Sequence, residues 1–136
     1  MTTTTPALTA VDRLLEAIVA GRGASVAGLY AEGAVLDATV PGWRFRERGG
    51  EAIAAQYAEW FADPGTLEEL DRQPVDGGEV LTYLLAWTEG GVPHAAHHCH
   101  RLTLDAEGLI AVDQVFCGGR WDATLLAAME EAEHAG

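Results

Sequence analysis

The hydrophobic pattern of this 136-residue chain changes its period once, and no other feature constrains the fold as strongly. In the first half, apolar residues recur at helical spacing over residues 10–20 and 50–62. From residue 67 onward the spacing is two, with candidate strands at 67–75, 79–88, 92–104 and 109–117. Segments rich in Asp and Gly separate these strands, and such segments form tight turns. The pattern predicts a helical front half followed by an antiparallel meander.

The helical segments carry start and stop signals. Thr9 precedes the first as an N-cap and Gly21 follows it. A second short helix is predicted from Ser25, and a closing helix from Asp122 to about residue 133. The other β-rich stretches are 34–40, before a Pro-Gly turn, and 43–46. We expect an α+β fold in which N-terminal helices cover the concave face of a curved antiparallel sheet, with a short C-terminal helix.

Composition narrows the class of protein. Residues 7–136 fit a single domain. Residues 1–6 contain four threonines and a proline, and without the basic and apolar regions of a signal peptide they predict a short disordered tail. Gly or a charged residue interrupts every apolar run before a membrane span is reached. The net charge of −13 would repel a nucleic-acid backbone. Two cysteines are too few for a disulfide framework, so the chain suits the reducing cytoplasm.

Four of the five histidines lie between residues 94 and 100, in the candidate strand 92–104. Alternate residues of a strand share a face, so His98 and His100 point one way and His97 the other. Cys99 then lies on the face opposite to Cys117, which argues against a disulfide between them.

The last hairpin determines what the histidines meet. If Leu104 pairs with Leu109 across the turn, His100 lies opposite Asp113. Such a carboxylate would fix the imidazole tautomer and stabilise the imidazolium, which suits a general base near neutral pH. A one-residue slip would instead set Gln114 opposite His100. A histidine–aspartate pair across a sheet can also be purely structural.

The segment VDRLLEAIVAGRGASVAGLYAEGAVLDATVPGWRFRERGGEAIAAQYAEWF resembles the front half of nuclear-transport-factor-2-like enzymes. These include ketosteroid isomerases, SnoaL-like polyketide cyclases, limonene-epoxide-type hydrolases and scytalone dehydratases. The final hairpin, HHCHRLTLDAEGLIAVDQVFCGG, is also similar to theirs. The resemblance spans roughly residues 8–118. It implies a cone-shaped sheet around a small-molecule pocket, a fold that hosts unrelated chemistries.

The resemblance does not transfer a steroid isomerase mechanism. The oxyanion-hole tyrosine of ketosteroid isomerases falls on Leu14, and their general-base aspartate falls near Ala38. Their protonated aspartate falls on His100. Two supporting tyrosine positions match, at Tyr30 and Tyr57. A different polar set is therefore expected in the same cavity.

The resemblance also implies which side chains face the pocket. It places His100 and Asp113 on the concave side of the sheet. In the predicted register Cys117 lacks a facing histidine, which argues against a nucleophilic role. The other implied pocket residues are Leu14, Tyr57, Trp60, Tyr83, Leu85, Trp87, His98, Ala111, Val115 and Cys117.

These observations predict an enzyme of general acid–base chemistry that acts on an apolar, oxygenated, polyketide-like molecule by cyclisation, isomerisation or dehydration, without metal or cofactor. His100 is the proposed base or acid and Asp113 orients it, while Tyr57 and His98 are candidate hydrogen-bond donors. One alternative is a non-catalytic ligand-binding module. Another is a metal-dependent enzyme, because the spacing of His98, His100 and Asp105 resembles a metal-ligand motif of cupins.

The resemblance further implies a homodimer formed through the convex sheet face. The apolar area on that face is too large to leave in water. The residues expected there are His97, Cys99, Arg101, Thr103, Ile110, Val112 and Phe116.

Overall fold

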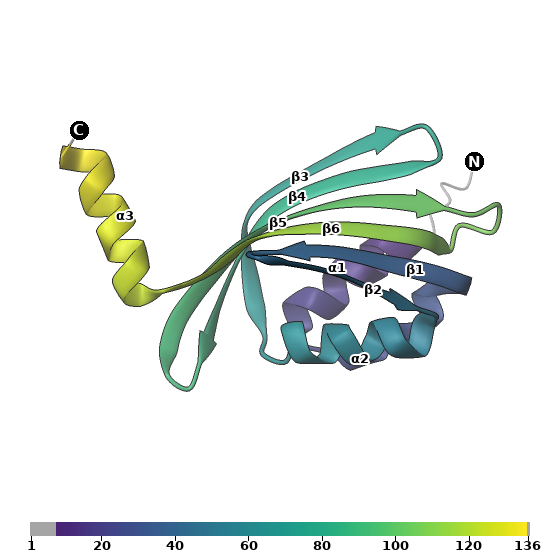
Figure 1. Ribbon diagram of the computed structural model, residues 1–136, viewed down its shortest axis with the longest axis horizontal. Helices are drawn as coiled ribbons and strands as arrows, with labels where there is room; N and C mark the ends of the chain where they lie inside the picture. Colours follow the sequence, from purple (N-terminus) through teal and green to yellow (C-terminus); the bar gives the residue numbers. More distant parts are fainter. Residues whose placement is uncertain (1–7, 136) are drawn as a thin grey trace, which may run out of the picture.

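The computed structural model describes residues 8–135 and has the predicted order of helices and strands (Figure 1). The predicted tail at residues 1–6 lies outside the described part. The α+β class is confirmed. The second predicted helix is instead a pair of 3₁₀ turns, Gly23–Ser25 and Ala27–Leu29. The helices are α1 (Ala10–Ala20), α2 (Gly50–Trp60) and α3 (Ala123–Ala135), and the strands are β1 (Tyr30–Val40), β2 (Trp43–Arg48), β3 (Gly65–Val75), β4 (Gly78–Glu89), β5 (Val92–Leu104) and β6 (Ile110–Asp122).

The six strands form one curved sheet in the order β2-β1-β6-β5-β4-β3. The strands of the meander are antiparallel, as predicted, but β1 and β6 pair in parallel. The prediction of a wholly antiparallel sheet is therefore wrong. Parallel neighbours need a long crossover connection, and here α2 and the meander return the chain to the side of β1.

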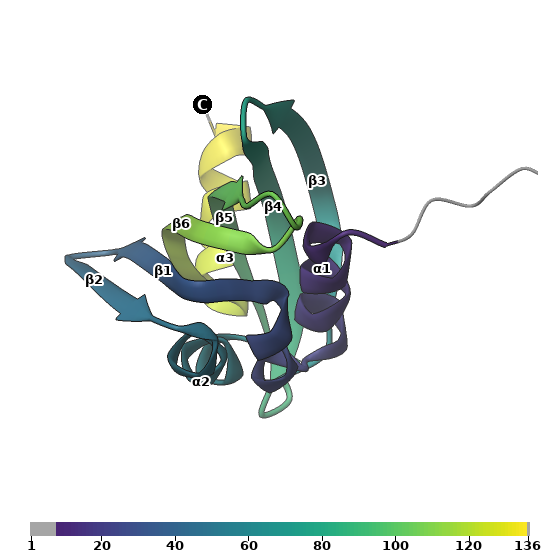
Figure 2. The same cartoon turned by 90° about the vertical axis from the view of Figure 1, so that its right-hand side faces the viewer.

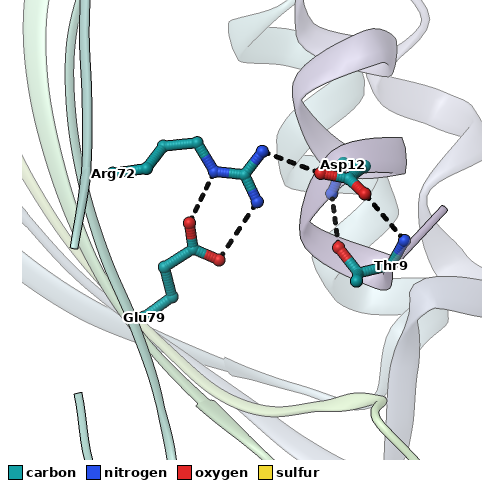
Figure 3. Close-up of polar contacts among 4 residues, drawn as sticks. All are labelled: Thr9, Asp12, Arg72 and Glu79. Carbon is teal, nitrogen blue, oxygen red and sulfur yellow. Dashed lines mark hydrogen bonds and ion pairs between the residues drawn. The ribbon is translucent and has the colours of Figure 1, made fainter. Parts of the chain in front are cut away.

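Helix α1 begins with a capping box. The amide of Asp12 donates to the Thr9 hydroxyl at 3.1 Å, and the Thr9 amide donates to Asp12 Oδ2 at 2.9 Å. The other Asp12 oxygen accepts from Arg72 Nη1 at 2.7 Å, while Arg72 also binds Glu79 (Figure 3). One arginine thus ties the start of α1 to strands β3 and β4.

Helix α2 is held close to the turn that precedes β1. Gly23 packs against the backbone of Tyr57, and a Cβ at Gly23 would overlap the Tyr57 carbonyl oxygen. Only glycine permits this approach. The contact fixes α2 so that Tyr57 and Phe61 enter the core, where they are 0% and 3% exposed.

Helices α1 and α2 lie on the same side of the sheet (Figures 1 and 2), which we call the helix face. Its strand residues are buried, among them Leu36, Leu81 and Leu102. The opposite side, the open face, carries Val112 and Phe116 at 37% and 43% exposure. Ile110 was expected there, but it is 0% exposed in the core; the register shift described below turns it inward.

Helix α3 stands at the far end of β6, away from α1 and α2 (Figure 1). Asp122 Oδ1 accepts from the Leu125 amide at 2.9 Å, so the predicted cap is present. None of the described α3 residues is buried. No helix within residues 8–135 has the length and apolar character needed to cross a membrane.

Candidate functional site

The β5–β6 hairpin has a register that differs from both alternatives considered from the sequence. Leu104 pairs with Ile110 and His100 pairs with Val115, so neither Asp113 nor Gln114 lies directly opposite His100. The register shifts between Thr103 and Leu104. The reason is local: the turn after β5 is closed by the Asp105 side chain, which accepts from the amides of residues 107 and 109, and an additional residue on β6 is left unpaired.

His100 and Asp113 nevertheless meet, on a diagonal across the two strands. His100 Nδ1 lies 2.9 Å from Asp113 Oδ1, although the direct partner of Asp113 is Leu102. Diagonal neighbours on a sheet are within reach of long side chains. Both side chains are 0% exposed, so this carboxylate and imidazole are sealed inside the core.

Asp113 accepts two further hydrogen bonds through its other oxygen. Tyr30 donates at 2.8 Å and Tyr57 donates to the same Oδ2 atom. Burial alone would raise the pKa of Asp113, but the charge and hydrogen bond of His100, with the two tyrosine hydroxyls, outweigh it and lower that pKa. Burial and the Asp113 charge hold the pKa values of Tyr30 and Tyr57 well above their usual range. The result is an ionised carboxylate ringed by proton donors.

Tyr83 completes the network on the far side of His100. Its hydroxyl lies 2.8 Å from His100 Nε2 and has no other side-chain partner among the described residues. A neutral imidazole with its proton on Nδ1 satisfies every group, because Nδ1–H then donates to Asp113 and Nε2 accepts from Tyr83. Burial, followed by the charge of Asp113, raises the pKa of Tyr83 well above 10. Tyr83, His100 and Asp113 thus form a continuous line of hydrogen bonds.

A cavity of about 540 Å³ lies beside this network. Five side chains implied by the resemblance line it: Trp60, Leu85, Trp87, His98 and Cys117. The cavity walls do not include the other implied residues, Leu14, Tyr57, Tyr83, His100, Ala111, Asp113 and Val115. Of these, Leu14 and Val115 are core residues at 0% and 1% exposure.

Two rings separate the cavity from the buried network. Phe61 lines the cavity and its ring centroid is 5.3 Å from that of Tyr57 and 5.8 Å from that of His98. The His98 ring in turn stacks on Tyr83, with centroids 5.4 Å apart and planes 2° apart. His98 therefore lies between the cavity and the Tyr83–His100 pair, and Phe61 lies between the cavity and Tyr57.

His98 is a neutral imidazole at the cavity wall. It is 7% exposed, and its Nδ1 is a buried nitrogen without a hydrogen-bond partner among the described residues. Burial, then the charges of His100 and His97, lowers the pKa of His98 from 6.5 to about 3. Near neutral pH it can serve as a hydrogen-bond donor rather than as a cation.

The expectation that Cys117 lacks a facing histidine is wrong. The observed register sets Cys117 directly opposite His98, with Sγ 3.7 Å from His98 Nε2. The Gly119 amide also donates to Sγ, at 3.4 Å. Cys99, on the open face, contacts Thr82 instead, and both cysteines are free thiols.

The geometry does not favour a metal site on His98 and His100. Both His100 nitrogens are engaged, by Asp113 and Tyr83. Asp105 belongs to the hairpin turn, where it accepts backbone amides. Over residues 8–135 no cluster of three or more His, Cys, Asp or Glu side chains is arranged to hold an ion.

Several cavity residues were not anticipated from the sequence. Arg120 was missed because the strand was expected to end at residue 117, before two glycines, whereas β6 continues to Asp122. Its guanidinium lies 5.3 Å from the Trp87 ring centroid and binds Glu89 at 2.6 Å. Phe61 was also missed as a cavity residue, although the apolar pair Trp60–Phe61 at the end of α2 could have indicated it. The other unanticipated lining residues are Val40, Pro41, Gln56, Glu59, Ala96 and Gly119.

Comparison with known proteins yields similarity in structure only. No family model matches the chain, and no curated protein matches it. Among solved structures, the chain is similar to a hypothetical protein with a ketosteroid isomerase-like fold from Catenulispora acidiphila DSM 44928, in complex with trimethylamine. The TM-score is 0.59 at 17% identity, covering 82% of this chain and 85% of that one. At this identity the likeness concerns the fold.

Proposed function

We propose that this chain, which has the ketosteroid isomerase-like fold of the nuclear-transport-factor-2-like class, is an enzyme that moves a proton on a small, largely apolar, oxygenated molecule. The observation that carries the proposal is the line of hydrogen bonds from Tyr83 through His100 to an ionised Asp113, one ring away from the cavity. Burying a carboxylate is costly even when it is paired. Such buried, perturbed groups next to a cavity are concentrated at functional sites.

The proposed proton path runs through the hydroxyl of Tyr83. When the His98 ring, which stacks on Tyr83, moves aside, the substrate gives a proton to the Tyr83 oxygen while the Tyr83 proton passes to His100 Nε2. The two transfers are concerted, because the raised pKa of Tyr83 disfavours a free tyrosinate. Asp113 orients His100 and stabilises the imidazolium that forms, and Tyr57 keeps Asp113 in place. The neutral His98 ring can donate a hydrogen bond to the developing oxyanion.

The cavity lining suggests the substrate class. Trp60, Phe61, Leu85 and Trp87 offer apolar and aromatic contacts, and a volume of about 540 Å³ suits one small organic molecule. This combination is consistent with cyclisation, isomerisation or dehydration of a polyketide-like compound without a cofactor. A cytoplasmic location belongs to the same proposal, since both cysteines are free thiols.

A non-catalytic binding module is the second candidate. It is favoured by the closed wall between the cavity and the buried network. The similar protein from Catenulispora acidiphila holds trimethylamine, and here Trp60, Trp87 and the Glu59 carboxylate offer contacts that suit a small amine cation. Titration of trimethylamine followed by tryptophan fluorescence tests this candidate directly.

Occupancy of the cavity can be detected through its cysteine. A compound bound between Trp60 and His98 should slow alkylation of Cys117 by iodoacetamide about tenfold or more, because Cys117 lines the same cavity. Cys99, on the open face that the homodimer would cover, is the internal control: however slow its alkylation, the rate should be the same with and without the compound. Intact-protein and peptide mass spectrometry of native and ligand-stripped protein measures both rates. Equal protection of the two thiols, or of neither by a compound known to bind, would contradict this location of the site.

The homodimer remains part of the proposal. Half-exposed apolar side chains on the open face, Val112 and Phe116, support it, because such surface is normally covered. Sedimentation velocity at micromolar concentration measures the oligomeric state.

A further inference from the structure

Cys117 is a nucleophilic side chain of the cavity wall that the proposed proton transfer does not use. It is a partly buried free thiol, and it lines the same cavity as His98. The two residues are direct partners on β6 and β5, and Sγ of Cys117 lies 3.7 Å from Nε2 of His98. A thiol beside a histidine is the arrangement from which cysteine nucleophiles are built.

A bulge in β6 directs a backbone amide at the same sulfur atom. The register shifts immediately after Cys117, where two residues, Gly118 and Gly119, lie opposite the single residue His97. Gly119 has a φ of 110°, a conformation that residues with a side chain rarely adopt. Its amide donates to Cys117 Sγ at 3.4 Å. Bulges are over-represented beside active sites, where they re-aim individual groups. Negative charge that develops on the sulfur as it reacts therefore meets an N–H donor already in place.

His98 has an unpaired nitrogen in addition to the one beside the thiol. The residue is 7% exposed, and its Nδ1 has no hydrogen-bond partner among residues 8–135. A neutral imidazole carries one proton, and with that proton on Nδ1 the other nitrogen, Nε2, is free to accept the proton of the thiol. The Nδ1–H group then lacks an acceptor, although buried polar groups are normally hydrogen-bonded. A carbonyl oxygen of a bound molecule is a suitable acceptor for it.

We propose that Cys117 and His98 bind small α,β-unsaturated carbonyl compounds covalently in this cavity. Sγ forms a bond with the β-carbon of the compound while the π bond between its α- and β-carbons breaks. The thiol proton passes to His98 Nε2 and from there to the α-carbon. The S–H bond is thus added across the double bond, the product is a thioether, and no oxidant or reductant is consumed. The inference goes beyond the proposed function and does not depend on proton transfer through Tyr83.

The surroundings of the thiol favour this class of compound over an acyl compound. Acyl transfer requires N–H donors around a carbonyl oxygen, whereas the Gly119 amide is directed at the sulfur itself. Burial, with the charges of His100 and His97, lowers the pKa of His98 from 6.5 to about 3. An imidazolium at this position therefore gives up its proton readily, and the α-carbon of the enolate accepts it. The aromatic and apolar cavity walls suit the carbon skeleton.

Cyclohex-2-enone tests the proposal at pH 7. Borohydride reduction fixes the reversible adduct, and peptide mass spectrometry then measures the adduct at each thiol. The rate at Cys117 should reach a plateau as the enone concentration rises, because the compound binds in the cavity before it reacts. Below the plateau, Cys117 should react about tenfold or more faster than the same residue in the urea-unfolded protein, since His98 and the Gly119 amide assist it only in the folded state. Cys99 should show no plateau. Cyclohexanone, the saturated analogue, should slow the reaction by occupying the cavity without forming an adduct.

The role of the histidine is tested with His98→Phe, which keeps an aromatic ring but removes the proton acceptor. This variant should form the Cys117 adduct about tenfold or more slowly. His134→Phe makes the same change at an exposed position of α3 and should keep the wild-type rate. Circular dichroism checks the folding of both variants. An equal rate in folded His98→Phe would overturn the role of His98. If the wild-type rate at Cys117 rises linearly with enone concentration and does not exceed that of the unfolded chain, Cys117 is an ordinary thiol and the proposal is wrong, whatever the variants show.

Discussion

Replacement of Asp113 by alanine should lower the free energy of unfolding by about 3–5 kcal/mol. The change removes the single acceptor of three buried donors, His100 Nδ1–H and the hydroxyls of Tyr30 and Tyr57. Each buried donor left without a partner costs stability, and the site lies away from the surface because Asp113 is 0% exposed. Urea unfolding at pH 7, followed by circular dichroism, measures the effect.

Asp37 provides the matched control on the adjacent strand. It belongs to β1 beside Asp113, but its partners are Arg44 at 2.7 Å and Arg46 at 3.7 Å, whose side chains are 54% and 53% exposed. Exposed ion pairs contribute little, so Asp37→Ala should have a far smaller effect. Similar losses in the two variants would mean that the buried network does not stabilise the core.

Acidification should destabilise the protein mainly through His98. The unfolded histidine takes up a proton near pH 6.5, whereas the buried ring does so only at about 3. Between these values the unfolded state binds the additional proton, so stability falls as the pH falls. This pKa shift corresponds to a loss of about 5 kcal/mol in the free energy of unfolding between pH 6.5 and pH 3. Below pH 3, His98 causes little further loss. Unfolding curves at half-unit pH intervals measure the slope.

Substitution of His98 isolates this contribution. His98→Phe keeps the ring stacked on Tyr83 but removes the titrating group, so most of the slope between pH 6.5 and 4 should disappear. His134→Gln, at an exposed position of α3, is the control and should retain the slope. Asp113 affects stability at lower pH than His98 does. Its pKa in the folded state lies below 3.8, so the stability that its carboxylate contributes is lost only as the pH falls below 3.8. An unchanged slope in His98→Phe would contradict the burial of a neutral His98.

The elements were predictable because their signals are local. Thr9 with Asp12 caps α1, and Asp122 caps α3, through side chains only three residues from the amides they bind. The change of period likewise located the meander. The parallel pairing of β1 with β6 was not predictable in this way, because it joins segments separated by α2 and the whole meander.

The site was only partly predictable, since it depends on the register of a single hairpin. The closure of the turn by Asp105 shifts the pairing, which sets His98 opposite Cys117 and turns His100 to Asp113 on a diagonal. Periodicity gives the face of each residue but not its partner. The rings of Phe61 and His98 separate the cavity from the buried hydrogen-bond network. No sequence pattern specifies the positions of these two rings.

The most direct test of the proposed function is the fate of the compound that the cavity selects. Native mass spectrometry of the gently purified protein identifies a co-purifying molecule, which is then incubated with ligand-stripped protein and followed by chromatography. We expect wild-type protein to convert it, and His100→Phe, checked for folding by circular dichroism, to bind it with conversion reduced about a hundredfold or more. If wild-type protein binds and releases the compound unchanged, the chain is a binding module and the proposed proton transfer is wrong.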